Sequence, residues 1–101
     1  AMGTMIQSLQ LTEQDFRIEK LQNHGVELKG NNDLLNLSRP DIIKNIHLEY
    51  LNADTDIIST NTFGANRISQ DDYHVSDLVF EINFEGARIA RAAIQEYQKN
   101  N

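Results

Sequence analysis

The polar side chains best suited to binding a small molecule are Thr60, Asn61, Thr62 and, beside them, the aromatic Phe63. The hydroxyls and the amide can donate and accept hydrogen bonds, and the phenyl ring can form an apolar wall. Alternation along an extended chain would place Thr60 and Thr62 on one side and Asn61 and Phe63 on the other. An equally weighted alternative is that these groups only cap the next helix, with Thr62 or Asn66 as the N-cap.

Thr60 is the last residue of a short segment, Asp56 to Thr60. This segment predicts a buried strand because Ile57 and Ile58 at its centre are apolar and β-branched. Helical patterns precede and follow the segment, and helix–strand–helix is the repeating unit of a parallel α/β fold. In such folds, ligands bind at the carboxyl ends of the strands. A single strand cannot satisfy its own backbone groups, so we expect this chain to be part of a larger domain.

The helices that would position this strand are predicted from caps and periodicity. Thr12 and Asp15 predict a helix that runs to about Gln22. The sequence Ser38-Arg39-Pro40-Asp41, with Ser38 as the cap, opens a second helix. A short helix is expected at 64–68 and a long one from Ser76. The inner face of the long helix is predicted to carry Val79, Ile82, Asn83, Gly86, Ala87, Ala90, Ile94 and Tyr97.

Composition excludes several classes of function. The 101 residues are 40% hydrophobic and 24% charged, with a formal net charge of −6, so the acidic surface argues against a nucleic-acid partner. No apolar run approaches the roughly 20 residues that span a bilayer, and no signal peptide is visible. The chain has no cysteine and therefore no disulfide or thiolate metal site. We expect a cytoplasmic location and no membrane partner.

The remaining titratable residues favour ordinary structural roles. His47 lies on a helix face beside Ile43 and Leu51, which predicts a packed histidine rather than a ligand. Asp71, Asp72 and His74 match no known cation-binding loop, and a solvated turn is the preferred interpretation. The sequence contains no phosphate loop, no Ser-His-Asp order and no zinc helix motif. No catalytic residue and no metal ligand is therefore predicted within the chain.

Two blocks carry a family resemblance when taken together: Lys-Gly-Asn-Asn-Asp at 29–33 and Thr-Asn-Thr-Phe at 60–63. With Met-Gly-Thr-Met-Ile-Gln at 2–7, they resemble the start of the homocysteine-binding domain of cobalamin-dependent methionine synthases, in order and over almost the whole chain. The resemblance implies an α/β fold, roughly the first quarter of a (β/α)8 TIM barrel, mostly helical with one clear strand near 56–61. Residues 1–101 would be a partial homocysteine-binding domain.

The family resemblance also implies a reaction and its cofactors. Such enzymes bind homocysteine through a zinc ion held by three cysteines and methylate it from methylcobalamin, which methyltetrahydrofolate recharges in other domains. Zinc makes a bound thiol lose its proton at neutral pH and become a nucleophile. The cysteines would lie in later barrel strands, so zinc and cobalamin would be bound by the parent enzyme and neither by this chain alone. The remaining barrel and the cobalamin and folate domains would be its partners.

The resemblance assigns a substrate-binding pocket to a few positions. Met2 and Gly3 would follow the first strand and line the pocket with backbone amides. Thr60 and Phe63 would face the amino-acid part of homocysteine, and Asn61 and Thr62 would fix the shape of their loop. The block at 29–33 would order the first connection rather than touch the substrate.

Three residues depart from the family's common pattern: Ile18 and Asp54 replace usual glycines, and Ser59 replaces a usual glutamate. The first two bear on turns. The third removes a carboxylate near the pocket and with it any acid–base role at that position.

Two rival functions stay open from the sequence. One is a non-catalytic helical interaction module, which the alanine-rich last helix and the acidic surface would suit. The other is a homocysteine methyltransferase that uses a different methyl donor, such as betaine or S-methylmethionine. Whether the parent is a methionine synthase or a methyltransferase with another donor, we expect the isolated chain to be inactive. We also expect it to self-associate, because it must cover an unpaired strand and several apolar helix faces.

Overall fold

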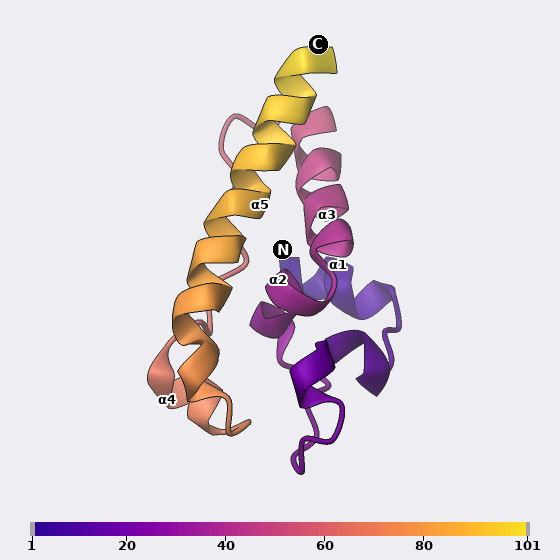
Figure 1. Ribbon diagram of the computed structural model, residues 1–101. Coiled ribbons are helices and arrows are strands. Elements are labelled where there is room, and N and C mark those ends of the chain that lie inside the picture. Colours follow the sequence, from indigo (N-terminus) through magenta and orange to yellow (C-terminus); the bar gives the residue numbers. More distant parts are fainter. Residues whose placement is uncertain (1, 101) are drawn as a thin grey trace.

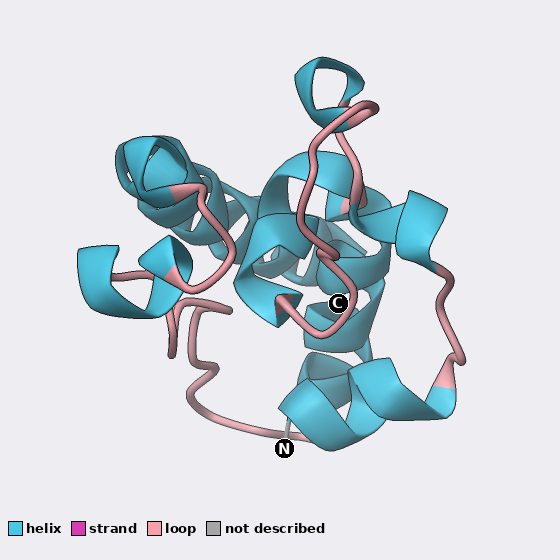
Figure 2. Cartoon of the chain, turned by 90° about the horizontal axis from the view of Figure 1, so that it is seen from below, coloured by secondary structure: helices cyan, strands magenta, loops and turns pink. Residues whose placement is uncertain are grey.

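The computed structural model describes residues 2–100, and all regular secondary structure in this range is helical (Figures 1 and 2). The α-helices are α1 (Met2–Ser8), α2 (Leu35–Ser38), α3 (Pro40–Asn52), α4 (Arg67–Asp71) and α5 (Val79–Asn100). The 3-10 turns are η1 (Glu13–Phe16), η2 (Glu19–Leu21), η3 (Asn32–Leu34) and η4 (Ser76–Leu78). None of these helices is both long enough and apolar enough to cross a lipid bilayer.

Helices α3 and α5 form the frame of the molecule. They run side by side in the same direction (Figure 1), and Lys44 Nζ of α3 lies 2.6 Å from Glu96 Oε1 of α5. Pro40 occupies the first turn of α3, as predicted, but the N-cap is Arg39 rather than Ser38. Ser38 is the last residue of α2 instead, and its hydroxyl donates back to the Leu34 carbonyl at 3.4 Å.

The core lies between α5 and the α2–α3 pair. From α3 the core takes Ile43 and Ile46. His47 of the same helix is also buried, as predicted for a packed histidine. The buried face of α5 consists of Ile82, Gly86, Ile89, Ala90 and Ala93. The predicted face of this helix was therefore partly wrong, since Asn83 and Ala87 are exposed. The buried residues recur three and four positions apart, as expected for a helix packed along one side.

The connection between α1 and η3 differs from its prediction. Thr12 and Asp15 do form a reciprocal cap, in which Asp15 Oδ2 accepts from the Thr12 amide at 2.8 Å. The predicted helix to Gln22 is wrong, because Arg17 and Ile18 are extended and divide the segment into the turns η1 and η2.

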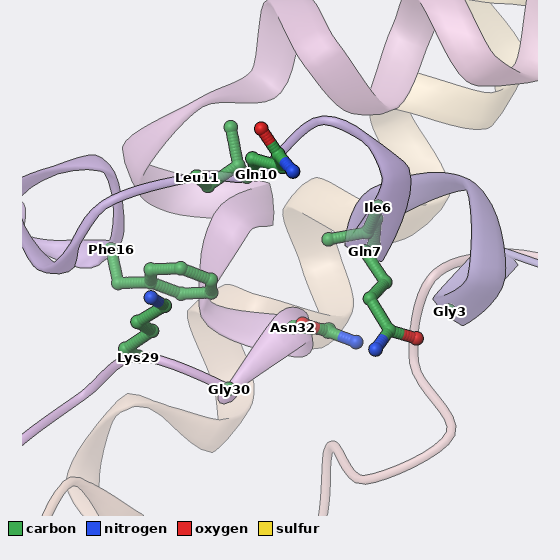
Figure 3. A pocket seen from close by; sticks show the side chains of 9 residues that line it. All are labelled: Gly3, Ile6, Gln7, Gln10, Leu11, Phe16, Lys29, Gly30 and Asn32. Carbon is green, nitrogen blue, oxygen red and sulfur yellow. The ribbon is translucent and has the colours of Figure 1, made fainter.

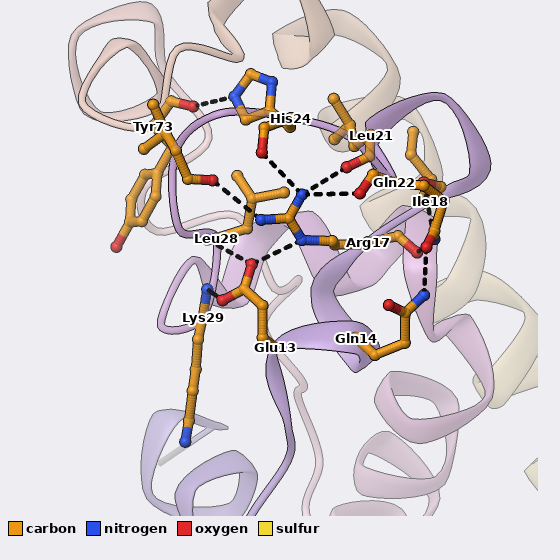
Figure 4. A network of polar contacts seen from close by, with 11 residues as sticks. Glu13, Gln14, Arg17, Ile18, Leu21, Gln22, His24, Leu28, Lys29 and Tyr73 are labelled. Carbon is orange, nitrogen blue, oxygen red and sulfur yellow. Dashed lines mark hydrogen bonds and ion pairs between the residues drawn. The ribbon is translucent and has the colours of Figure 1, made fainter.

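Arg17 holds this irregular connection together (Figure 4). Its Nη1 donates to the carbonyl oxygens of Leu21 at 2.7 Å and His24 at 3.1 Å, and its Nη2 donates to that of Val26 at 3.3 Å. Its Nε is paired with Glu13 Oε2 at 2.9 Å. The guanidinium thus supplies donors to carbonyls of a segment that has little regular secondary structure to satisfy them.

Glu13 completes the same network from the other side of Arg17. Its carboxylate accepts the backbone amides of Leu28 and Lys29, each at 2.8 Å. Partial burial opposes ionisation of Glu13, but the two backbone amides and Arg17 outweigh it and lower the pKa of this carboxyl below its ordinary value. The ionised form of Glu13 is the form that the connection binds.

The predicted strand at 56–61 is wrong, and with it the α/β fold class of the chain taken by itself. No strand occurs among residues 2–100, and Ile57, expected to be buried, is 81% exposed. The segment from Asp56 to Thr60 makes no backbone–backbone hydrogen bond within the described range. The physical reason is that no other strand within residues 2–100 pairs with it, and strand structure requires a neighbour. The expectation of a mostly helical chain is confirmed.

Asp54 bears out the interpretation of its position as a turn. It follows the end of α3 with φ of +65°, in the left-handed region that glycine adopts most readily. An aspartate tolerates this conformation better than most residues. The turn directs the chain out of α3 and into the exposed segment.

Candidate functional site

The residues singled out from the sequence lie around one open pocket of about 650 Å³. The chain brings them from two segments far apart in sequence, the start of α1 and the loop that precedes α4. The pocket is lined by Met2, Gly3, Gly30, Asn32, Asp33, Ser59, Thr60, Asn61, Thr62, Phe63 and Gly64. All six predicted substrate-binding residues are in this set.

Met2 and Gly3 reach the pocket from a different element than expected. They form the first turn of α1, not a loop after a strand. Met2 is half-buried and Gly3 is exposed. The open side of Gly3 faces the η3 turn, since a Cβ built there would lie 3.9 Å from Asn32 Nδ2. The start of α1 and the turn at Asn32 therefore form adjacent walls.

The two threonines lie on the same side of their loop, as alternation predicts. Their Oγ1 atoms are 2.7 Å apart and share a hydrogen bond. Asn61 and Phe63 do not share the other side: Asn61 is 7% exposed, whereas the ring of Phe63 is completely exposed. Alternation fails after Asn61 because the chain bends there and then turns toward α4.

The capping alternative applies to Asn66 and not to the threonines. Asn66 is the N-cap of α4, and its Oδ1 accepts the Ser69 amide at 2.8 Å. Thr60 and Thr62 bond to each other instead. Their hydroxyls are therefore not engaged in capping the helix and lie at the edge of the pocket.

Asp33 is the charged residue among those that line the pocket. Its Oδ2 accepts the backbone amide of Gly64 at 2.9 Å, and a Cβ at Gly64 would lie 2.8 Å from Asp33 Oδ1, so a larger residue there would displace the carboxylate. Burial raises the pKa of this carboxyl above its ordinary value, and the hydrogen bonds it accepts offset only part of that effect. The pocket therefore contains a carboxylate that a nearby positive charge would stabilise.

The contribution of the 29–33 block was missed by the sequence reasoning, which assigned it only to ordering the first connection. Gly30, Asn32 and Asp33 line the pocket. Asn31 does have the ordering role, since its side chain exchanges hydrogen bonds of 2.7 and 3.0 Å with buried Gln70 of α4. The signal in the sequence was the density of polar side chains in the block, but nothing local told which of them face a pocket.

A second open pocket, of about 700 Å³, adjoins the first (Figure 3). The two share Gly3, Gly30 and Asn32. The others that line the second pocket are Ile6, Gln7, Gln10, Leu11, Phe16 and Lys29. Helix α1 stands between the two openings and buries only Ile6.

The side chains of this chain do not form a zinc site. The sequence contains no cysteine. Within residues 2–100, no three His, Asp or Glu side chains are grouped so that they could hold a metal ion. Asp71, Asp72 and His74 form no such group in this range either, which leaves the solvated-turn interpretation in place.

A family model described as homocysteine S-methyltransferase matches residues 1–101, and the chain therefore belongs to the homocysteine S-methyltransferase family. The match extends over the whole chain, which includes both walls of the pocket. Membership implies that these helices are part of a TIM-barrel domain. Enzymes of this family methylate homocysteine and use zinc.

Proposed function

We propose that this chain forms part of the homocysteine site of a cobalamin-dependent methionine synthase, and that the pocket binds the amino-acid end of the substrate. One observation carries the proposal: within a chain of this family, three separate segments, at 2–3, 30–33 and 59–64, meet around one pocket whose lining includes the Thr60–Thr62 hydroxyl pair. The lining is polar enough to hold a zwitterion and open enough to admit one.

Homocysteine presents a carboxylate and an ammonium group to this site. The hydroxyls of Thr60 and Thr62 can donate hydrogen bonds to the carboxylate. The carboxyl group of Asp33 can accept the ammonium group, because its raised pKa reflects burial without a cationic partner. A bound ammonium would supply that partner and lower the pKa of Asp33 again.

The methyl donor and the metal are assigned outside this chain. Methylcobalamin is the proposed donor because the blocks at 29–33 and 60–63 together resemble cobalamin-dependent enzymes. The zinc ligands are proposed to lie elsewhere in the parent protein, since the side chains here do not fit a zinc site. A methyltransferase that uses betaine or S-methylmethionine is the alternative, and an assay of the full-length protein with each donor distinguishes them.

The test of the pocket is a Thr60→Val change in the full-length protein. Valine keeps the shape of threonine but removes the hydroxyl, so we expect the KM for homocysteine to rise about tenfold, the equivalent of about 1.4 kcal/mol. Thr4→Val is the matched control, because Thr4 is exposed and does not line the pocket. An unchanged KM in Thr60→Val would overturn the proposed site.

The isolated chain has only part of the barrel and is expected to be inactive. Calorimetric titration of the 101-residue chain with homocysteine should show binding no tighter than about millimolar, which corresponds to roughly 4 kcal/mol of binding free energy. Saturable binding well below that concentration would contradict the expectation that the remaining barrel is needed.

A further inference from the structure

The loop that carries the two threonines is held from beneath by a pair of buried asparagines. Asn36 of α2 is 1% exposed, and its Nδ2 donates to the Asn61 carbonyl at 2.8 Å and to the Ile82 carbonyl of α5 at 3.1 Å. In return Asn61 Nδ2 donates to Asn36 Oδ1 at 3.1 Å and to the Asn32 carbonyl at 2.8 Å. The Asn36 amide thus bonds both the backbone and the side chain of Asn61.

This bonding gives the loop a fixed position although its backbone lies in no sheet. A backbone carbonyl buried without a partner costs about 1–3 kcal/mol. Asn36 removes that cost for Asn61 and at the same time connects the loop to α5 through Ile82. The side-chain amide of Asn36 therefore sets the distance between the loop and α5.

Gly86 of α5 allows the loop to lie this close to α5 because it has no side chain. A Cβ at Gly86 would lie 2.7 Å from Thr62 Cγ2 and 2.9 Å from Asn36 Nδ2, both closer than side-chain carbons approach other atoms in folded proteins. Gly86 is buried in a regular helix, so its lack of a side chain serves the close approach rather than a special backbone conformation. Even one methyl group would push the loop away from α5.

Displacement of Thr62 would be transmitted to Thr60, because their hydroxyls are bonded at 2.7 Å. We propose that Asn36 and Gly86 are positioning residues that set the place of the Thr60–Thr62 hydroxyl pair in the pocket, and thereby the affinity for homocysteine. Neither residue lines the pocket itself. The inference rests on the proposed function, since it assumes that the pair binds the substrate.

The test is Gly86→Ala in the full-length protein, with KM for homocysteine and kcat measured separately. A misplacement of about 1 Å at a binding group can cost up to a hundredfold, and we expect the KM to rise about tenfold while kcat changes less than about threefold. Ala87→Val is the matched control, because it adds bulk to the neighbouring, exposed position of α5 and is expected to leave both constants unchanged.

A second-site change separates positioning from general damage. Thr62→Ser removes the methyl group that the new Cβ would strike and keeps the hydroxyl. In a double-mutant cycle, the effect of Gly86→Ala on KM should be smaller in the Thr62→Ser background, and part of it should remain because the new Cβ still meets Asn36 Nδ2. If Gly86→Ala fails to fold, as circular dichroism would reveal, Asn36→Ala carries the test of the positioning role instead. A penalty of equal size in both backgrounds would overturn the proposal.

The outcomes also separate this inference from the function on which it depends. If Thr60→Val raises the KM and Gly86→Ala does not, the pocket stands and the positioning role fails. If Thr60→Val leaves the KM unchanged, the proposed substrate site fails first. Asn36→Ala is expected to raise the KM as Gly86→Ala does, and an unchanged KM in that variant would count against the amide as a positioning group.

Discussion

Two irregular segments of this molecule differ in how they satisfy their backbone. The connection at 12–31 has few regular hydrogen bonds, yet Arg17 and Glu13 supply partners to its carbonyls and amides. The segment at 55–60 carries β-branched residues but makes almost no backbone contacts and exposes Ile57. The first segment satisfies many of its backbone groups with its own side chains and is joined to the rest of the chain through Asp15–Arg39, His24–Tyr73 and Asn31–Gln70. The second leaves its backbone open to a neighbour.

The difference indicates which of the two segments depends more on other parts of the parent protein. A polar clasp formed within one segment does not depend on other parts of a protein. The exposed amides and carbonyls of the other segment are open to water in this chain, and a neighbouring strand of the parent domain would pair them. Family membership gives the same conclusion by a separate route, since a TIM barrel supplies parallel strands on both sides.

The largest effect is expected from breaking the clasp. Arg17→Met keeps most of the apolar stem but removes the donors to four carbonyls, those of Leu21, Gln22, His24 and Val26, and we expect the free energy of unfolding to fall by about 3 kcal/mol. Arg91→Met on the exposed face of α5 is the control and should change it by less than about 0.5 kcal/mol. Urea denaturation of the 101-residue chain measures both. Equal, small effects would mean that the connection is not held by Arg17.

A smaller effect is expected from His47, which lies beneath the open segment. Its ring is fully buried, neither ring nitrogen has a hydrogen-bond partner within residues 2–100, and burial lowers its pKa below the ordinary 6.5. The unfolded chain then binds a proton that the folded chain rejects, so stability should fall as the pH drops through about 6.5. The raised pKa of Asp33 works in the opposite direction, at pH values above 3.8.

His47→Leu should flatten the pH dependence between about pH 7.5 and 5.5 and raise stability at pH 7 by about 1 kcal/mol, because the unpartnered nitrogens are removed. His74→Asn is the control: His74 is exposed in a left-handed turn that asparagine also tolerates, and the slope should persist. Thermal melts across this pH range provide the measurement. A slope that survives in His47→Leu would assign it to another group.

The smallest effect on stability is expected in the open segment itself. Ile57→Lys should change the free energy of unfolding by less than about 0.5 kcal/mol, because the side chain is 81% exposed. The same change should weaken the self-association expected of the isolated chain, since a lysine on an exposed edge opposes pairing. Ile68→Lys, on exposed α4, is the control. Sedimentation equilibrium that found the unchanged chain monomeric at high concentration would contradict this prediction.

The sequence predicts those features that depend on nearby residues. The cap-and-proline opening of α3 and the helix expected from Ser76 are local patterns, and both helices form, although α5 begins at Val79 after the 3-10 turn η4. Asn66 as a cap and Asp54 as a turn residue are likewise local. Each depends on positions within one or two turns of chain, which is the range over which propensities act.

What the sequence could not give depends on distant partners. The apolar run before Thr60 has the composition of a strand, but pairing requires a second strand that composition cannot supply. The helix predicted to Gln22 is replaced by turns because Arg17 reaches carbonyls up to nine residues away. Thr60 to Phe63 stand out by residue type, and Met2 and Gly3 through the family resemblance. Asn36 and Gly86 become visible only when α2, α5 and the loop are seen together.

The bare ring of Phe63 links assembly to affinity. Its side chain is wholly in water at the rim of the pocket, and covering a phenylalanine is worth about 2–3 kcal/mol. A surface that covered this ring would therefore be stabilised at a place next to the threonine pair. It would also remove water from the part of the pocket in which a zwitterion would bind. Where such a surface also contacts the bound ligand favourably, its docking and the occupancy of the pocket favour each other by the same factor.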